Sequence, residues 1–340
     1  MIFASVPPLE AEGGVVAYRV RAGGEAFAKG QRLSAEDCAV LSSAGVTQIT
    51  IAREEPGDVG ENEAARRLGQ AALGEGLRAA EPFTGRVNLF AEADGVLLVD
   101  AGAIQRFNAL DEGMTIATLP PFRRVRAGEM IATVKIIPFA LPGMLVDAGL
   151  AIFSIGKPLT VAPFQPRRVG LIQLSLPETK PSVLAKTAKV TAERLAALGS
   201  ALAFEQRFAH QEDTLVEALS ALNPDQFDIL LIFGAAAISD RRDVIPRAIE
   251  RSGGQIEHLG MPVDPGNLLL IGECHAKPVI GAPGCARSPI ENGFDWVLQR
   301  LSAGLTVTSG DIRAMGVGGL LMEIGTRPQP RAGHSSTEPA

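Results

Sequence analysis

The 340-residue sequence is poor in cysteine, has no surplus of basic residues and lacks a leader-like start. Its three cysteines, Cys38, Cys274 and Cys285, are too few and too scattered for a disulfide scaffold, so we expect a reducing compartment, the cytoplasm. Lysine and arginine number 32 against 38 aspartates and glutamates, and this net charge of −6 argues against a dedicated nucleic-acid-binding protein. The first residues, MIFASVPPLEAEGG, lack the basic start and apolar run of a signal peptide.

An uninterrupted membrane-spanning run is also lacking. Between Lys135 and Lys157 the only charge is Asp147, and the length would suit a membrane helix. Proline and glycine divide this stretch into short pieces, at Pro138, Pro142, Gly143 and Gly149. Because short apolar runs bounded by these residues are typical of buried strands, we predict strands here and no contact with a membrane.

Common catalytic fingerprints are absent as well. No G-x-G-x-x-G follows a strand, and neither a Walker loop nor a G-x-S-x-G elbow is present. The neighbouring histidines and cysteines do not have the spacing of a zinc site; they are His258, Cys274, His275 and Cys285. The sequence therefore gives no support to the commonest nucleotide-binding, hydrolase or zinc-thiolate sites.

What is present fits a soluble protein of two domains, with 46% hydrophobic and 21% charged residues. Residues 1–165 mix short strand-like runs with helical patterns, which predicts a mixed α/β, β-rich region. Residues 166–306 alternate strand and helix patterns, which predicts an α/β domain with a doubly wound, largely parallel sheet. A short segment follows at 307–325, and 326–340 is expected to be a disordered tail or linker.

Local sequence patterns predict the bounds of one strand and one helix in the N-terminal region. Residues 15–22 have the pattern of one strand. Ser34 predicts the start of a short helix that Gly45 ends.

The most apolar strand, 228–234, leads into a loop of small residues, GAAAISDRRD at 234–243. In doubly wound sheets ligands bind beyond the carboxyl ends of strands, and small residues let the backbone approach a ligand closely. Asp243 suits two roles about equally well. It is either the N-cap of the following helix or a carboxylate that holds a ligand hydroxyl or a Mg²⁺-bound water.

A second loop, GAPGCARSPIENG at 281–293, carries helix-start signals. Ser288 and Glu291 have the spacing of a capping box for a closing helix over 288–301, with Pro289 at its first position. Free N–H groups at a helix N-terminus attract anions, and Arg287 adds positive charge. The alternative is a capped helix without a ligand. A third segment, MPVDPGNLL at 261–269, fits a tight turn and carries no functional signal alone.

Polar residues in otherwise apolar settings occur in the N-terminal half. They are Glu61, Asn62, Glu63, Arg86, Asn88 and Lys135. They either line a cleft that faces the other domain or are each part of the solvated surface.

The three loops, in this order, resemble those of the molybdopterin-binding domain of molybdenum-cofactor biosynthesis proteins, above all the molybdopterin molybdenumtransferases. That family carries S-G-G-x-S-x-G-x-x-D after a buried strand, then K-P-G-K-P, then G-L-P-G-N-P. Here GAAAISDRRD corresponds to the first motif, with Asp243 at the position of its closing aspartate. DPGNL at 264–268 corresponds to the second motif, and GAPGCA at 281–286 corresponds to the third. Glu178 falls on the glutamate of the family's G-D-E-L turn.

The similarity extends upstream to 23–52, which resembles a segment that precedes the ligand domain in the transferases. The sequences MPVDPGNLLL and GAPGCARSPIENGFDWVL most resemble those of a subgroup of molybdopterin-binding proteins. Members of that subgroup are often fused to a nucleotidyltransferase similar to molybdenum-cofactor cytidylyltransferase.

The resemblance implies molybdopterin, or its nucleotide form, as the ligand, with Mg²⁺ and molybdate as candidate further ligands. It implies catalytic roles for Asp243 and Glu178, with Asp243 also the metal ligand. The implied cofactor-binding residues lie on the three loops: Gly234, Ala235, Ala236, Asp240, Asp264, Gly266, Asn267, Pro283, Gly284, Cys285, Arg287 and Ser288. It also implies a homodimer.

Departures from the family pattern leave three interpretations open. Asp264 and Asn267 replace both lysines of K-P-G-K-P, Ala235 and Ala236 replace two glycines, and His210 stands where the family has an acidic residue. One interpretation is an enzyme that inserts molybdate or transfers a nucleotidyl group. Another is a non-catalytic carrier or chaperone that works with a nucleotidyltransferase or a molybdoenzyme. The third is a fold recruited to another phosphorylated ligand.

Overall fold

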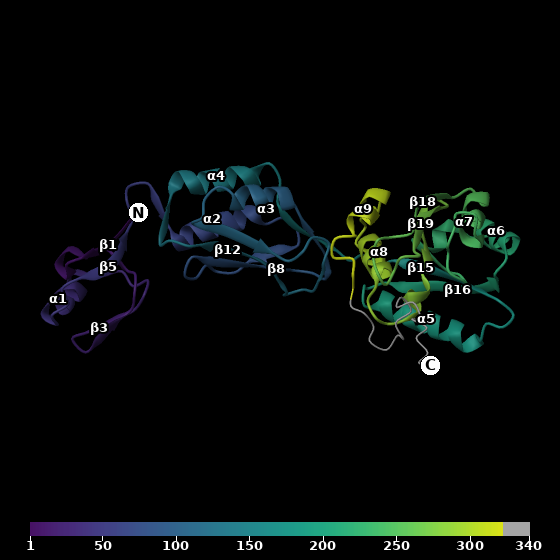
Figure 1. Cartoon of the computed structure of the whole chain (residues 1–340), viewed down its shortest axis with the longest axis horizontal. Coiled ribbons are helices and arrows are strands. Elements are labelled where there is room, and N and C mark those ends of the chain that lie inside the picture. Colours follow the sequence, from purple (N-terminus) through teal and green to yellow (C-terminus); the bar gives the residue numbers. More distant parts are fainter. Residues whose placement is uncertain (322–340) are drawn as a thin grey trace, which may run out of the picture. The chain divides into compact units, whose positions relative to one another are not determined.

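The computed structural model describes residues 1–321, which belong to two compact units, Met1–Phe164 and Gln165–Ala340 (Figure 1). The tail expected at 326–340, and the end of the segment at 307–325, lie outside the described residues.

The first 53 residues form a small β-rich part with one longer helix. An antiparallel sheet has the order β1-β5-β2, with bounds Ile2–Val6, Ile49–Arg53 and Val15–Val16. The remaining elements are the 3₁₀ helix η1 (Pro8–Glu10), the hairpin strands β3 (Val20–Ala22) and β4 (Glu25–Phe27), and helix α1 (Ala35–Ser43). The helix prediction is confirmed, because the Ser34 hydroxyl accepts the Asp37 N–H at 3.1 Å.

The single strand predicted at 15–22 is wrong. Strand β2 pairs with β5, whereas Val20 pairs with Phe27 in the β3–β4 hairpin. The hairpin turns at Gly23 and Gly24, whose φ angles are +58° and +85°. Glycine adopts positive φ at no steric cost, so the chain turns back at once instead of continuing one long strand.

Residues 58–164 form a larger part with its own hydrophobic core. Its sheets have the orders β10-β12-β8-β7, β11-β9-β14 and β13-β6. The strands are β6 (Asp58–Gly60), β7 (Leu77–Ala79), β8 (Arg86–Ala91), β9 (Gly95–Val99), β10 (Met114–Thr118), β11 (Arg124–Val125), β12 (Met130–Ile136), β13 (Ala140–Pro142) and β14 (Leu159–Pro163). The helices are α2 (Glu61–Ala72), α3 (Ala101–Asn108) and α4 (Gly143–Ser154).

The apolar stretch between Lys135 and Lys157 contains α4, so the prediction that it consists of strands is wrong in its second half. Gly149 is a packing residue rather than a breaker. A Cβ there would lie 2.8 Å from Leu68 of α2 and 3.0 Å from Phe107 of α3, so the missing side chain lets the three helices pack closely. Within residues 1–321, no helix combines the length and the apolar character needed to cross a membrane.

Residues 165–321 contain a six-stranded mixed sheet of order β16-β15-β17-β20-β19-β18. The strands are β15 (Arg168–Ser175), β16 (Ala201–Ala209), β17 (Ile229–Phe233), β18 (Gln255–Leu259), β19 (Leu270–Cys274) and β20 (Lys277–Ala282). Strands β16, β15, β17 and β20 run parallel, whereas β19 is antiparallel to both its neighbours. His275 and Ala276, with φ of +53° and +56°, make β19 and β20 a tight hairpin. The α/β class is therefore confirmed, whereas a doubly wound parallel sheet is not.

Helices pack on both faces of this sheet. They are α5 (Pro181–Ala196), α6 (Glu212–Ser220), α7 (Val244–Arg251), α8 (Gly293–Ser302) and α9 (Ser309–Ala314), with the 3₁₀ helices η2 (Pro224–Gln226) and η3 (Gly284–Arg287). Ile232 packs in a core cluster with residues of α6 and α7. Phe233 points to the opposite face, where its ring lies 6.2 Å from that of Phe294 in α8.

Helix α8 begins at Gly293, so the start predicted at Pro289 and the Ser288–Glu291 capping box are wrong. The capping box is formed instead by Asn292 and Asp295. Asn292 Oδ1 accepts the Phe294 N–H at 3.1 Å, and Asp295 Oδ2 accepts the Asn292 N–H at 2.9 Å.

We expect Gly69→Ala to destabilise the first unit by about 1–3 kcal/mol, because a Cβ there would lie 2.4 Å from Val87 Cγ1. Alanine elsewhere in a helix is about 1 kcal/mol more favourable than glycine. The matched control is Gly102→Ala in α3, which would meet only the side-chain ends of Arg106 and Asp100 and should leave stability unchanged or slightly raised. Urea unfolding followed by circular dichroism measures both, and equal stabilities would contradict this packing.

Candidate functional site

The three loops singled out in the sequence lie at one edge of the six-stranded sheet. Loops 234–243 and 283–292 follow β17 and β20, which are parallel, so both leave from the same edge. Segment 260–269 precedes β19, whose first residue Leu270 pairs with Gly281 near the end of β20. Because β19 is antiparallel, its start lies at this edge too. We call this edge of the sheet, at the carboxyl ends of β17 and β20, the carboxyl edge.

In the first loop, Asp243 is the N-cap of α7. Its Oδ1 accepts the Val244 N–H at 2.7 Å and its Oδ2 accepts the Ser239 N–H at 3.3 Å. Asp240 is engaged by Arg242, whose Nε lies 2.7 Å from Asp240 Oδ1. This hydrogen bonding lowers the pKa of Asp240 to about 2, so the exposed carboxylate is ionised at neutral pH.

The backbone at the start of this loop is held from two sides. The Ala235 N–H donates to His210 Nδ1 at 3.4 Å, and Arg287 Nη2 donates to the Gly234 carbonyl at 2.9 Å. Ala236, next along the chain, is exposed. The loop therefore presents small side chains at the carboxyl edge, with the Gly234 carbonyl and the Ala235 N–H engaged within the protein.

Segment 260–269 supports the start of α8. The Pro265 carbonyl accepts the Gly293 N–H at 2.9 Å, and a Cβ on buried Gly266 would lie 3.0 Å from the Gly293 backbone. Asn267 Nδ2 donates to the Met261 carbonyl at 3.3 Å. The backbone of Asp264 pairs with that of residues 319–321. Each implied ligand contact on this segment thus has a structural role already.

In the loop after β20, Arg287 is the central cation. Its Nη1 donates to Thr187 Oγ1 at 2.5 Å, and its guanidinium lies 5.1 Å from the centre of the Phe233 ring. Burial lowers the pKa of Arg287, although an arginine remains charged. No carboxylate within residues 1–321 forms an ion pair with it. Its two bonds to neutral oxygens leave other N–H donors for a ligand.

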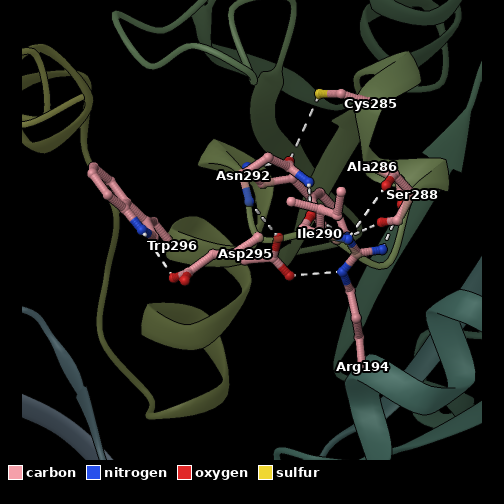
Figure 2. Close-up of polar contacts among 10 residues, drawn as sticks. Arg194, Cys285, Ala286, Ser288, Ile290, Asn292, Asp295 and Trp296 are labelled. Atoms are coloured by element: carbon pink, nitrogen blue, oxygen red, sulfur yellow. Dashed lines mark hydrogen bonds and ion pairs between the residues drawn. The ribbon is translucent and has the colours of Figure 1, made fainter. Parts of the chain in front are cut away.

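Arg194 of α5 organises this loop, as Figure 2 shows. Its side chain donates to three carbonyls, those of Ala286 at 2.5 Å, Ser288, and Ile290 at 3.3 Å. Its Nε also lies 2.7 Å from Asp295 Oδ1, and only 9% of the Arg194 side chain and 12% of the Asp295 side chain are exposed. One buried guanidinium thus joins α5, the loop and the first turn of α8.

The first N–H groups of α8 are all used within the protein. Gly293 donates to Pro265, Phe294 to Asn292 Oδ1, and Asp295 to the Asn292 carbonyl. The helix N-terminus expected to bind an anion in this loop is therefore capped within the protein, and Arg287 is the cation of the loop. Of the remaining implied residues in this loop, Pro283 is buried and Gly284 is exposed. The Cys285 Sγ lies 3.8 Å from Asn292 Oδ1, and the Ser288 hydroxyl accepts the Ile290 N–H.

Glu178, in the turn after β15, is exposed. No hydrogen bond or ion pair within residues 1–321 joins it to Asp243. Likewise, residues 1–321 contain no group of three or more His, Cys, Asp or Glu side chains suited to hold a metal ion. The structure thus brings the three loops together, whereas no contact within residues 1–321 joins Glu178 to Asp243.

Comparisons with known proteins give a short family match and distant structural neighbours. A family model described as a domain of unknown function (DUF8806) matches residues 5–53. A search of curated protein sequences finds no match.

Solved structures with some similarity include a molybdopterin biosynthesis MoeA protein from Pyrococcus horikosii, with 14% identity and a TM-score of 0.30 over 89% of this chain and 75% of that one. Molybdenum cofactor biosynthesis protein B has 15% identity and a TM-score of 0.28 over 40% of this chain and 87% of its own. A molybdenum cofactor biosynthesis protein from Pyrococcus furiosus has 14% identity and a TM-score of 0.25 over 89% and 64%. These TM-scores are too low to define the fold or the ligand of this chain.

Sequence reasoning missed Arg194, Thr187 and Asp295. A signal for the first two does exist. Thr187, Thr191 and Arg194 follow one another at spacings of four and three along α5, so they share one helix face. Thr187 and Thr191 are 1% exposed, and such a polar stripe on a buried face indicates a partner across it.

We expect Arg194→Met to lower the stability of the second unit by about 3–5 kcal/mol, because it leaves Asp295 buried without its partner and three carbonyls without their donor. Trp296 of α8 is the single tryptophan, so its fluorescence during urea unfolding reports on this unit. The matched control is Arg207→Met, which breaks an exposed pair with Glu205 and should cost at most about 1 kcal/mol. A similarly small effect for Arg194→Met would show that the loop does not depend on it.

Proposed function

We propose that residues 165–321 bind molybdopterin, or its nucleotide form, at the carboxyl edge, and that the chain serves molybdenum-cofactor biosynthesis. The observation that carries the proposal is Arg287, a half-buried cation that joins two of the loops and has no carboxylate partner within residues 1–321. A guanidinium of this kind suits the phosphate of the ligand. The resemblance of the three loop sequences to the molybdopterin-binding domain supplies the choice of ligand.

The surroundings of Arg287 suit a bound ligand. Apart from Gly284 itself and its two chain neighbours, no atom of the described residues lies within 4 Å of the position that a Cβ on exposed Gly284 would occupy, so there is open space beside η3. On the facing loop, Ala235 and Ala236 have side chains too small to block a ligand that hydrogen-bonds to the backbone. We therefore propose that the phosphate lies beside Arg287, between the loop 283–292 that carries this arginine and the facing loop 234–243.

Segment 264–267 does not suit an anion. Asp264 brings negative charge where the resembling family has lysine, and the Asn267 amide already donates to the Met261 carbonyl. A bound molybdate would therefore lack the positive charge that this segment supplies in the family.

A non-catalytic carrier or chaperone is the second candidate, and the positions of Asp243 and Glu178 favour it. Both oxygens of Asp243 accept backbone N–H groups, one from Val244 at the start of α7 and one from Ser239 in the preceding loop, and Glu178 is exposed in a separate turn. Should Mg²⁺ bind with the ligand, Asp243 is the carboxylate that would hold it and the metal would neutralise phosphate charge. The partner of a carrier would be a nucleotidyltransferase or a molybdoenzyme.

We expect isothermal titration of the full chain to show binding of molybdopterin, or of its AMP or CMP form, with a Kd on the order of micromolar or below. Arg287→Gln should weaken binding by about tenfold to a hundredfold, since it removes a charge-assisted hydrogen bond to the phosphate. Asp243→Ala should weaken binding mainly in the presence of Mg²⁺. The control Arg251→Gln, at the far end of α7, should leave binding unchanged.

Absence of binding to every form would contradict the proposed ligand. If binding is found, turnover assays with Mg²⁺ and molybdate separate the two candidates, because a carrier releases its ligand chemically unchanged. Sedimentation of the same samples tests the homodimer that the resemblance implies.

A further inference from the structure

Five of the six polar residues singled out in the N-terminal half lie near one another in the first unit, whereas Glu63 is exposed and pairs with Arg66 within α2. Arg86 and Lys135 are cross-strand neighbours on β8 and β12, and Asn88 and Thr133 form the next pair but one on the same face. Val87, between them, points to the other face and packs against Gly69 of α2. Figure 1 shows α2, α3 and α4 on one side of these strands, so the polar pairs lie on the side away from the helices.

The turn before β8 positions the Lys135 amine. Lys135 Nζ donates to the Thr84 carbonyl at 2.6 Å and lies 3.7 Å from Glu61 Oε2. Gly85 makes this approach possible, because a Cβ there would lie 2.4 Å from Glu61 Oε2 and 2.9 Å from Lys135 Nζ. Asn62, the next residue of α2, fixes the same turn by accepting the Gly85 N–H at 2.7 Å.

The Glu61–Lys135 pair is largely buried but loose. The two side chains are 21% and 26% exposed, yet their charged atoms are farther apart than in a hydrogen bond. Burial raises the pKa of Glu61 and lowers the pKa of Lys135, so neither charge is fully stabilised by the other. The Lys135 ammonium has three N–H donors, so donors remain for a ligand besides the one that binds the Thr84 carbonyl.

Positive charge is in excess around this pair. Lys29 and Arg86 both lower the pKa of Lys135 by repulsion, and Glu61 is the carboxylate that opposes them. Arg86 itself donates to the Thr133 hydroxyl at 3.3 Å and has no carboxylate partner within residues 1–321. Nearby, Asn88 Oδ1 is buried with no hydrogen-bond partner among the described residues. The cluster therefore has unused donors, surplus positive charge and one unused acceptor.

We propose that this cluster binds an oxyanion, the phosphate or carboxylate group of a small molecule, between Arg86 and Lys135, and that Glu61 competes with it for the Lys135 amine. The anion takes hydrogen bonds from the guanidinium of Arg86 and from the free donors of Lys135. Glu61 holds the amine in place when the anion is absent. The proposal is independent of the function proposed for residues 165–321.

The test is a titration of the ¹⁵N-labelled full chain with pyrophosphate and, separately, with succinate, followed at the Gly85 amide. This resonance reports on the cluster and not on Arg287. We expect saturable shifts, with Arg86→Gln and Lys135→Gln each weakening binding by about tenfold or more. Tighter binding of pyrophosphate assigns the group to phosphate, and tighter binding of succinate assigns it to carboxylate.

Two further variants distinguish a binding site from a structural ion pair. Glu61→Gln removes the competitor and should strengthen binding severalfold, whereas a merely structural pair would give weaker binding or none. Arg106→Gln on α3 removes the same charge away from the cluster and should leave the affinity unchanged. Lys135→Arg, which keeps the charge, should retain most of the binding if Lys135→Gln fails to fold. No saturable shift at Gly85, or an equal loss for Arg106→Gln, would overturn the proposal.

Discussion

The buried guanidinium of Arg194 is the interaction on which the carboxyl edge depends. Without it, the carbonyls of Ala286, Ser288 and Ile290 would lack a common donor, and Asp295 would be a buried charge without a partner. Because Asp295 also closes the capping box of α8, Arg194 ties the first turn of this helix to α5 and to the loop. The loop after β20 is therefore fixed by α5, and Arg287 is held in turn between α5 and the loop after β17.

This dependence explains which parts of the fold the sequence predicts. Ser34 and Asp37 act on neighbouring residues, so local spacing was enough to place that helix correctly. The start of α8 is predicted too early because Ser288–Glu291 and Asn292–Asp295 have the same local spacing, and the second pair forms the capping box. Arg194, which holds Asp295, lies 101 residues from it along the chain, so local spacing alone does not distinguish the two pairs. Strands β16 and β18 have no clear strand pattern in the sequence because they are the edge strands of the sheet, whose polar residues obscure the apolar alternation.

The candidate site shows the same division. The loops 234–243 and 283–292 follow strands β17 and β20, and because these strands are parallel both loops lie at one edge of the sheet. The hairpin of β19 and β20, which carries segment 260–269 to that edge, depends on positive φ at His275 and Ala276, residues that give little warning of such a turn. The same holds in the first unit, where only the cross-strand register shows that Arg86 and Lys135 are neighbours.

We propose that the loops at the carboxyl edge form one ligand site around Arg287. Hydrogen exchange of the full chain with and without molybdopterin tests this site most directly, because exchange reports on backbone N–H groups loop by loop. We expect slower exchange in 234–243 and 283–292 together when the ligand is present. Unchanged exchange in both loops at saturating ligand, or protection confined to other segments, would contradict it.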